Sequence, residues 1–142
     1  MIADAVAFNL AWTEADLQGF VMRTARLLGY AVHHTRFALG SDAGYPDLTM
    51  VNPRQGRTLF AELKREGKSP TLGKTVRSGR GLRRIRGQAD WLLDLLTAEQ
   101  EAYWWVPSDA PDIVEILRSG PRRDMACLRR LREFLRETER GR

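Results

Sequence analysis

The feature that most constrains the fold is a charged hairpin predicted between residues 44 and 64. Two apolar runs flank a polar turn at 52–56 that contains proline and glycine, a pattern typical of two antiparallel strands. Side chains alternate between the two faces of a strand, so Glu62 and Lys64 share one face. Asp47 opens the preceding strand. The hairpin is therefore predicted to bring two acids and a lysine together at one end.

Burying such charges costs several kcal/mol unless something compensates for them. Carboxylate oxygens are preferred ligands of hard divalent cations, and Asp47 and Glu62 together can bind one Mg²⁺ or Mn²⁺ ion. The backbone carbonyl of Leu63 is a further candidate ligand. The alternative interpretation is a turn acid at Asp47 and an edge strand whose charged face simply meets water at Glu62 and Lys64.

The chain resembles the VRR-NUC family of the PD-(D/E)xK nuclease superfamily. Pro46-Asp47 followed by Glu62-Leu63-Lys64 matches the Pro-Asp…(Asp/Glu)-x-Lys pattern. The order of the family continues with Glu14, with residues 29–34, with Gln88 and with residues 102–109. The resemblance spans residues 13–118 and implies a single α/β domain, with an αβββαβ core, a mixed sheet flanked by helices, and further helices at the C-terminus.

The resemblance also implies an activity and roles for individual residues. It implies a Mg²⁺- or Mn²⁺-dependent deoxyribonuclease that acts as an endonuclease on branched or nicked DNA, in the manner of a Holliday-junction resolvase. The implied process is DNA repair or recombination, and the implied assembly is a homodimer, as in some relatives. Asp47 and Glu62 would bind the metal ion, and Lys64 would orient or deprotonate the attacking water. Glu14 would complete a second metal site, although an acid in a first helical turn is stabilising by itself. Gln88 would position the phosphate or the lysine, or is a plain polar residue at a helix start.

Positive charge is concentrated between residues 65 and 86. The chain carries a formal charge of +5, and a cationic segment of this kind favours a polyanionic partner, with nucleic acid first and an anionic membrane second. The segment has several glycines and little apolar periodicity, so we expect a flexible insert without regular structure that grips DNA. Tyr45, beside Asp47, is a further candidate contact. The candidate DNA-binding residues of the insert are Arg65, Lys68, Lys74, Arg77, Arg80, Arg83, Arg84 and Arg86.

The remaining elements follow from hydrophobic periodicity and from capping residues. The chain of 142 residues suits a single domain. The amphipathic helix at its end favours packing on its own domain over forming a dimer, and the tryptophans Trp91, Trp104 and Trp105 are predicted to be core residues. Helices are expected at 13–28, 86–98, 111–120 and 121–140, and strands at 30–37 and 102–106, in addition to the hairpin.

Other features exclude several classes of protein. Cys127 is the only cysteine, which excludes an intramolecular disulfide and a cysteine-based metal cluster and suits a reducing cytoplasm. The N-terminus lacks the basic region of a signal peptide, and no apolar run is long enough to span a bilayer. We expect a soluble cytoplasmic protein without membrane association. The sequences 67–69 and 73–75 resemble part of a P-loop but lack its first glycine, so no nucleotide cofactor is expected.

Three alternatives to the endonuclease remain open. The first is an exonuclease or a single-strand nuclease with the same chemistry. The second is a DNA-binding module that keeps the fold without catalysis. The third is an RNA-binding protein that depends on the basic segment alone and does not need Asp47 or Glu62.

Overall fold

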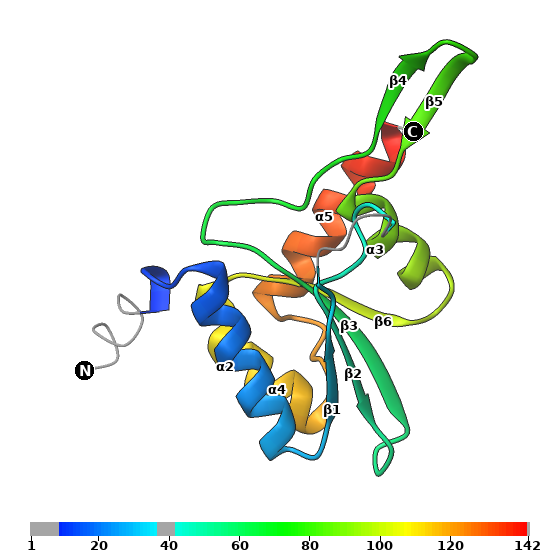
Figure 1. Cartoon of the computed structure of the whole chain (residues 1–142). Helices are drawn as coiled ribbons and strands as arrows, with labels where there is room; N and C mark the ends of the chain where they lie inside the picture. Colours follow the sequence, from blue (N-terminus) through cyan, green and yellow to red (C-terminus); the bar gives the residue numbers. More distant parts are fainter. Residues whose placement is uncertain (1–8, 37–41, 142) are drawn as a thin grey trace.

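The computed structural model describes residues 9–36 and 42–141 (Figure 1). The fold is α/β, with a four-stranded mixed sheet in the order β1-β2-β3-β6. Strand β3 pairs antiparallel with β2 and parallel with β6, and β1 pairs antiparallel with β2. The sheet consists of β1 (Ala31–His34), β2 (Leu48–Asn52), β3 (Arg57–Leu63) and β6 (Glu101–Trp105). The helices are α2 (Glu14–Leu27), α3 (Gln88–Thr97), α4 (Ala110–Ser119) and α5 (Ala126–Arg140), with the short 3-10 helix η1 (Pro107–Asp109). The α/β class and the mixed sheet predicted from the sequence are confirmed.

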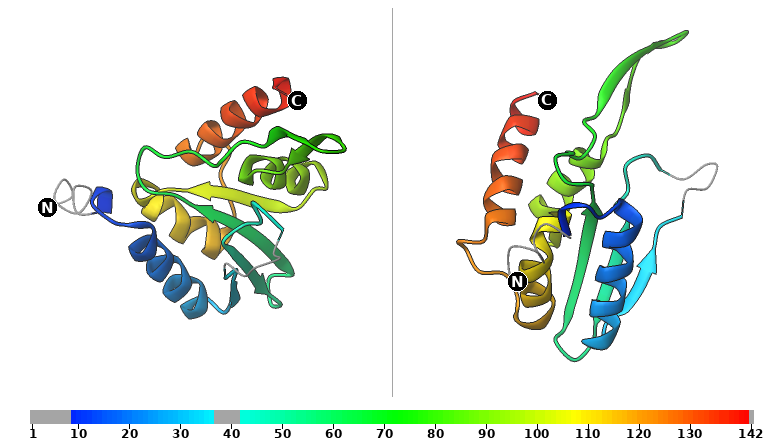
Figure 2. Two further views of the ribbon diagram at one scale, coloured as in Figure 1. Left: turned by 45° about the horizontal axis from the view of Figure 1, so that its top comes forward. Right: turned by 90° about the vertical axis from the view of Figure 1, so that its left-hand side faces the viewer.

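Helices cover both faces of the sheet, α2 and α4 on one and α3 and α5 on the other (Figure 2, left). The alternation of β3 explains this arrangement. Leu59, Ala61 and Leu63 belong to the core with α2 and α4, whereas Phe60 packs with the core that includes α3 and α5. Glu62 is two residues from Phe60 on the same strand, so its side chain lies on the same face of the sheet, the face covered by α3.

The predicted helices form with small shifts at their ends. Thr13 caps α2 through a capping box with Asp16, which satisfies backbone donors of the first turn. The amphipathic C-terminal helix begins only at Ala126, and Leu131 and Leu135 are buried with the residues of β6. This contact explains its apolar stripe without a second subunit.

Strand β1 is shorter than the predicted 30–37. It ends at His34, and beyond it Thr35 turns toward the loop before β2. The backbone N–H of Thr35 donates to the Asp47 carbonyl at 2.8 Å, and its hydroxyl donates to the Pro46 carbonyl at 2.8 Å. Phe37, the predicted end of the strand, lies outside the described residues.

The expectation of an insert without regular structure is wrong. Residues of the basic segment form an antiparallel hairpin of β4 (Lys74–Ser78) and β5 (Gly81–Ile85) that projects from the body (Figures 1 and 2). The usual sequence signal of a strand is the alternation of apolar and polar residues, which arises when one face of the strand is buried. Neither strand of this hairpin has a buried residue, so that signal is missing from the sequence.

Candidate active site

Asp47 and Glu62 lie at the same end of the β2–β3 hairpin. Leu48 pairs with Ala61, so the register, extended by one residue, places Asp47 opposite Glu62 on the α3 face. One carboxylate oxygen of Asp47, Oδ2, accepts a hydrogen bond of 2.8 Å from the backbone N–H of Leu63. The predicted convergence of the two acids is confirmed, and the backbone of Leu63 lies beside them.

Glu62 is nearly completely buried, with 1% of its surface exposed. Its Oε1 accepts a 2.5 Å hydrogen bond from the side-chain amide of Gln88 and lies 4.0 Å from Nζ of Lys64. Its Oε2 is buried and accepts no hydrogen bond from an N–H or hydroxyl group in the described part of the chain, but the Glu62 carboxyl shares a hydrogen bond with the side chain of Asp47. Two carboxylates this close repel each other when both are ionised, so the pair is suited to a ligand that supplies positive charge.

The surroundings of Glu62 disfavour its charged form. Burial, and next the negative charge of Asp47, raise the pKa of the Glu62 carboxyl to about 9, against the opposing influence of Lys64. The carboxyl therefore holds a proton at neutral pH when no cation is present. A cation bound between the two acids would reverse this balance, because it favours both ionised carboxylates.

Gln88, the first residue of α3, connects Glu62 to the loop that precedes β4. Its Oε1 accepts from the backbone N–H of Thr71 at 2.9 Å, and its own N–H donates to the Thr71 hydroxyl at 3.2 Å. The amide oxygen is thus engaged by Thr71, which directs the amide nitrogen toward Glu62. The predicted proximity of Gln88 to the acids is confirmed. Thr71 was missed, because it lies in a loop and no motif marks it.

Glu14 does not join Asp47 and Glu62 in a compact three-ligand group. Among the described residues, the one group of three metal-capable side chains with ligand atoms within 4.8 Å of one another is Asp109, Asp112 and Cys127. Glu14 is exposed, although its negative charge contributes a minor increase to the pKa of Glu62.

The group of Asp109, Asp112 and Cys127 has a structural explanation. Asp109 binds Arg130 at 2.6 Å and accepts a 2.9 Å hydrogen bond from the N–H of Val106. Burial, together with the charges of the two aspartates, raises the pKa of the Cys127 thiol to about 12, and a protonated thiol is a poor metal ligand.

A pocket of about 390 Å³ opens onto Asp47 and Gln88. Tyr45 lines this pocket, and its ring packs edge-on against Trp91 with centroids 5.1 Å apart. Tyr45 therefore shares this pocket with Asp47. Thr35 and Arg36 also line this pocket.

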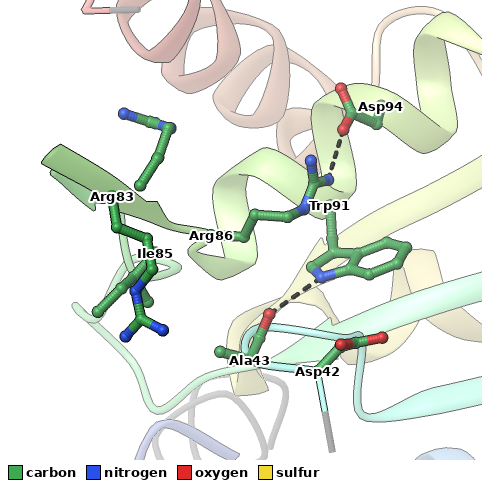
Figure 3. A pocket seen from close by; sticks show the side chains of 8 residues that line it. Asp42, Ala43, Arg83, Ile85, Arg86, Trp91 and Asp94 are labelled. Atoms are coloured by element: carbon green, nitrogen blue, oxygen red, sulfur yellow. Dashed lines mark hydrogen bonds and ion pairs between the residues drawn. The ribbon is translucent and has the colours of Figure 1, made fainter. Parts of the chain in front are cut away.

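A second pocket, of about 720 Å³, lies at the base of the β4–β5 hairpin (Figure 3). Trp91 donates from its indole nitrogen to the Ala43 carbonyl at 3.0 Å, and the Arg86 guanidinium lies 4.8 Å from the ring centroid while it pairs with Asp94. The two pockets share Asp42 and Ala43. The prediction that Trp91 belongs to the core is wrong, because this ring forms a pocket wall; Trp104 and Trp105 are buried as predicted.

The structure distributes the candidate DNA-binding residues over three places. Arg83, Arg84 and Arg86 line the second pocket. Lys74, Arg77 and Arg80 lie on the projecting hairpin, whose strand β5 also carries Arg83 and Arg84. Arg65 and Lys68 lie in the loop after β3, which is attached to η1 because the Glu66 carboxylate accepts hydrogen bonds from the N–H and the hydroxyl of Ser108 at 2.8 and 2.9 Å.

No family model, no curated protein and no solved structure matches this chain. The VRR-NUC resemblance therefore stays a prediction from the motif. Among the residues that the structure describes, none of the helices combines the length and the apolarity needed to cross a membrane.

Proposed function

We propose that this chain is a Mg²⁺- or Mn²⁺-dependent deoxyribonuclease with a PD-(D/E)xK-type domain of the VRR-NUC kind. The observation that carries the proposal is the convergence of Asp47, Glu62 and Lys64 at one end of the β2–β3 hairpin. The Lys64 ammonium lies 4.0 Å from Glu62 Oε1, and Asp47 is held beside Glu62 through the N–H of Leu63. These three residues are the ones that the motif names.

The residues present fit a hard divalent cation. Asp47 and Glu62 would hold it through carboxylate oxygens, with the Leu63 carbonyl as a further ligand. The contact between the buried Glu62 carboxyl and Asp47 supports this assignment, because a divalent cation would offset the repulsion between the two ionised carboxylates. When bound, the ion supplies Lewis-acid polarisation of the scissile phosphate and makes a water molecule more acidic.

The protein's own side chains would perform the remaining steps. Lys64, whose side chain is only 16% exposed, would hydrogen-bond the attacking water and offset the negative charge that develops on the phosphoryl oxygens. Gln88 holds the Glu62 carboxyl through its amide nitrogen and so fixes the orientation of one ligand. Tyr45 lines the pocket in front of Asp47 and would contact the nucleotide next to the scissile bond.

The proposal also includes the DNA substrate and the cellular compartment. The basic residues on the β4–β5 hairpin and around the second pocket favour DNA, and the resemblance favours branched or nicked DNA cut by an endonuclease, with a homodimer as in some relatives. We assign the activity to the cytoplasm, because the single cysteine, Cys127, is buried and free, as suits a reducing compartment.

The test is an assay of the purified protein with Mg²⁺ or Mn²⁺ on duplex, nicked, flap, four-way-junction and single-stranded DNA. We expect metal-dependent cleavage that chelation abolishes, with a preference for branched or nicked substrates. Cleavage from the ends alone, or of single strands alone, would replace the endonuclease with the exonuclease or single-strand alternative. Tight binding of DNA without cleavage of any substrate would indicate a DNA-binding module.

A further inference from the structure

The β4–β5 hairpin presents both of its faces to solvent. All ten residues of its two strands are exposed or only half-buried, and it projects beyond the helices in Figure 1 and in the right-hand view of Figure 2. Leu82, near its tip, is 75% exposed. An isolated two-stranded hairpin is marginally stable in water, so an arm of this kind is suited to a surface that it meets in a complex.

The charge of the hairpin has one sign. Residues 74–85 contain five cations and no acid. Val76 pairs with Arg83 and Arg77 pairs with Leu82. Directly opposed residues share a face and successive residues alternate between faces. One face therefore carries Lys74 and Arg83, the other carries Arg77 together with Arg84, whose guanidinium is paired with Asp90 at the root of the hairpin, and Arg80 lies in the turn.

Positive charge on both faces is informative about the shape of the partner. A flat anionic surface, such as a membrane, meets only one face of a ribbon. A DNA groove has a row of phosphates on each wall, so both faces of an inserted ribbon can reach phosphates. The major groove of B-DNA is about 12 Å wide and admits a two-stranded ribbon, whereas the minor groove is about 6 Å wide.

The root of the hairpin is tied to the candidate active site. The Arg84 guanidinium binds Asp90 of α3 at 3.1 Å, and Asp90 is 1% exposed. Thr71, just before the hairpin, binds Gln88, which in turn binds Glu62. These contacts hold the arm in a defined direction relative to Glu62. Five residues at about 3.3 Å each give a reach of about 16 Å, which is about five base pairs at about 3.4 Å per pair.

We propose that the β4–β5 hairpin enters the major groove of double-stranded DNA. The protein would then recognise a stretch of duplex that lies a few base pairs from Asp47 and Glu62. The location of this duplex relative to a scissile phosphate rests on the proposed function. The groove contact itself does not, and it is tested without cleavage.

The test compares two triple variants by binding measured without divalent metal. The hairpin variant carries Arg77→Gln, Arg80→Gln and Arg83→Gln. The matched control carries Arg54→Gln, Arg118→Gln and Arg123→Gln, three exposed arginines outside the hairpin and both pockets. Fluorescence anisotropy is recorded across a salt series with duplex DNA of about 20 base pairs, which exceeds the reach of the arm, and with single-stranded DNA, double-stranded RNA and anionic lipid vesicles. Thermal melting verifies that each variant is folded.

We expect the hairpin variant to lose at least about tenfold in affinity for duplex DNA, and its salt slope to fall by about 2 to 3, because each phosphate contact contributes about 0.9. The loss on single strands and on double-stranded RNA should be several-fold smaller, since the major groove of A-form RNA is too deep and narrow for side chains to read. The control should retain its preference for duplex DNA.

An equal loss on duplex DNA, single strands and double-stranded RNA would overturn the groove contact, as would unchanged binding to all of them, or a loss confined to vesicles. The outcome is separable from that of the proposed function. A duplex-selective loss in a protein that cleaves nothing would keep the groove contact and refute the nuclease. Metal-dependent cleavage by a protein whose hairpin variant binds every ligand as the wild type does would keep the nuclease and refute the groove contact.

Discussion

The amide nitrogen of Gln88 lies 2.5 Å from Oε1 of Glu62 and joins the start of α3 to the buried end of β3. We predict that Gln88→Met, which keeps the side-chain length but removes both hydrogen-bonding groups, weakens the binding of divalent metal ions. It should also cost about 1 to 3 kcal/mol of stability, because the buried Glu62 carboxyl loses the hydrogen bond that the Gln88 amide donates to it. Metal titration followed by calorimetry, and urea unfolding, measure the two effects. Gln100→Met, at an exposed glutamine, is the matched control. Equal effects of the two substitutions would show that Gln88 has no special relationship to the site.

Glu62 makes the stability of the metal-free protein depend on pH. Its pKa is raised from 4.5 to about 9 in the folded state, so the folded protein binds a proton that the unfolded chain releases. This contribution is complete at pH values below the unfolded pKa and is lost as pH rises toward the folded pKa, by up to about 1.4 kcal/mol per pH unit.

We therefore predict that Glu62→Gln, which cannot ionise, gains stability relative to the wild type as pH rises from 6 to 8 in the presence of a chelator. Urea unfolding at both pH values measures the difference. Glu133→Gln, at an exposed position of α5, controls for loss of a negative charge. A difference between Glu62→Gln and wild type that stays constant over this pH interval would contradict the environment described for Glu62.

Gly87 lies between β5, the second strand of the β4–β5 hairpin, and α3. A Cβ at this position would lie closer than 3.0 Å to backbone atoms of Thr71, Leu72 and Gly73. Backbone atoms cannot move aside as a flexible side chain can, so we predict that Gly87→Ala costs at least about 2 kcal/mol. Gly79, in the turn of the hairpin, has open space around it, and Gly79→Ala should change the stability by less than about 0.5 kcal/mol. Chemical unfolding of both variants decides whether the hairpin is rigidly attached.

The central hairpin could be predicted from the sequence, because one of its faces is buried. Leu48, Met50, Leu59 and Ala61 are fully buried, and their alternation reveals both the strands and the face that carries Glu62. The position of Gln88 beside the acids came from the order of the motif.

Other parts had no signal of this kind. Strands β4 and β5 bury neither face, so their polar residues are typical of a loop. The bond between Thr71 and Gln88 joins residues 17 apart in the chain, and it depends on how the loop folds back onto α3. Trp91 is an aromatic residue of the kind that usually lies in a core, but it is half-buried and lines a pocket, where Tyr45 and Arg86 contact its ring.

Asp47→Ala and Lys64→Ala test the assigned chemistry separately from DNA binding. Asp47 is half-buried and Lys64 is 16% exposed in its side chain, and neither belongs to the apolar cores. We predict that each variant folds and binds DNA with affinity close to that of the wild type, while its cleavage rate falls by at least about 100-fold, as expected when a metal ligand or an electrostatic stabiliser of the transition state is removed.

The most direct measurement is the Mg²⁺-dependent cleavage rate of a nicked or four-way-junction DNA at saturating DNA, for the wild type, Asp47→Ala and Lys64→Ala purified in parallel. The proposal predicts cleavage by the wild type that requires Mg²⁺ or Mn²⁺, and no cleavage above background by either variant while both still bind the DNA. Wild-type activity retained in either variant, or no metal-dependent cleavage by the wild type on any DNA, would contradict it.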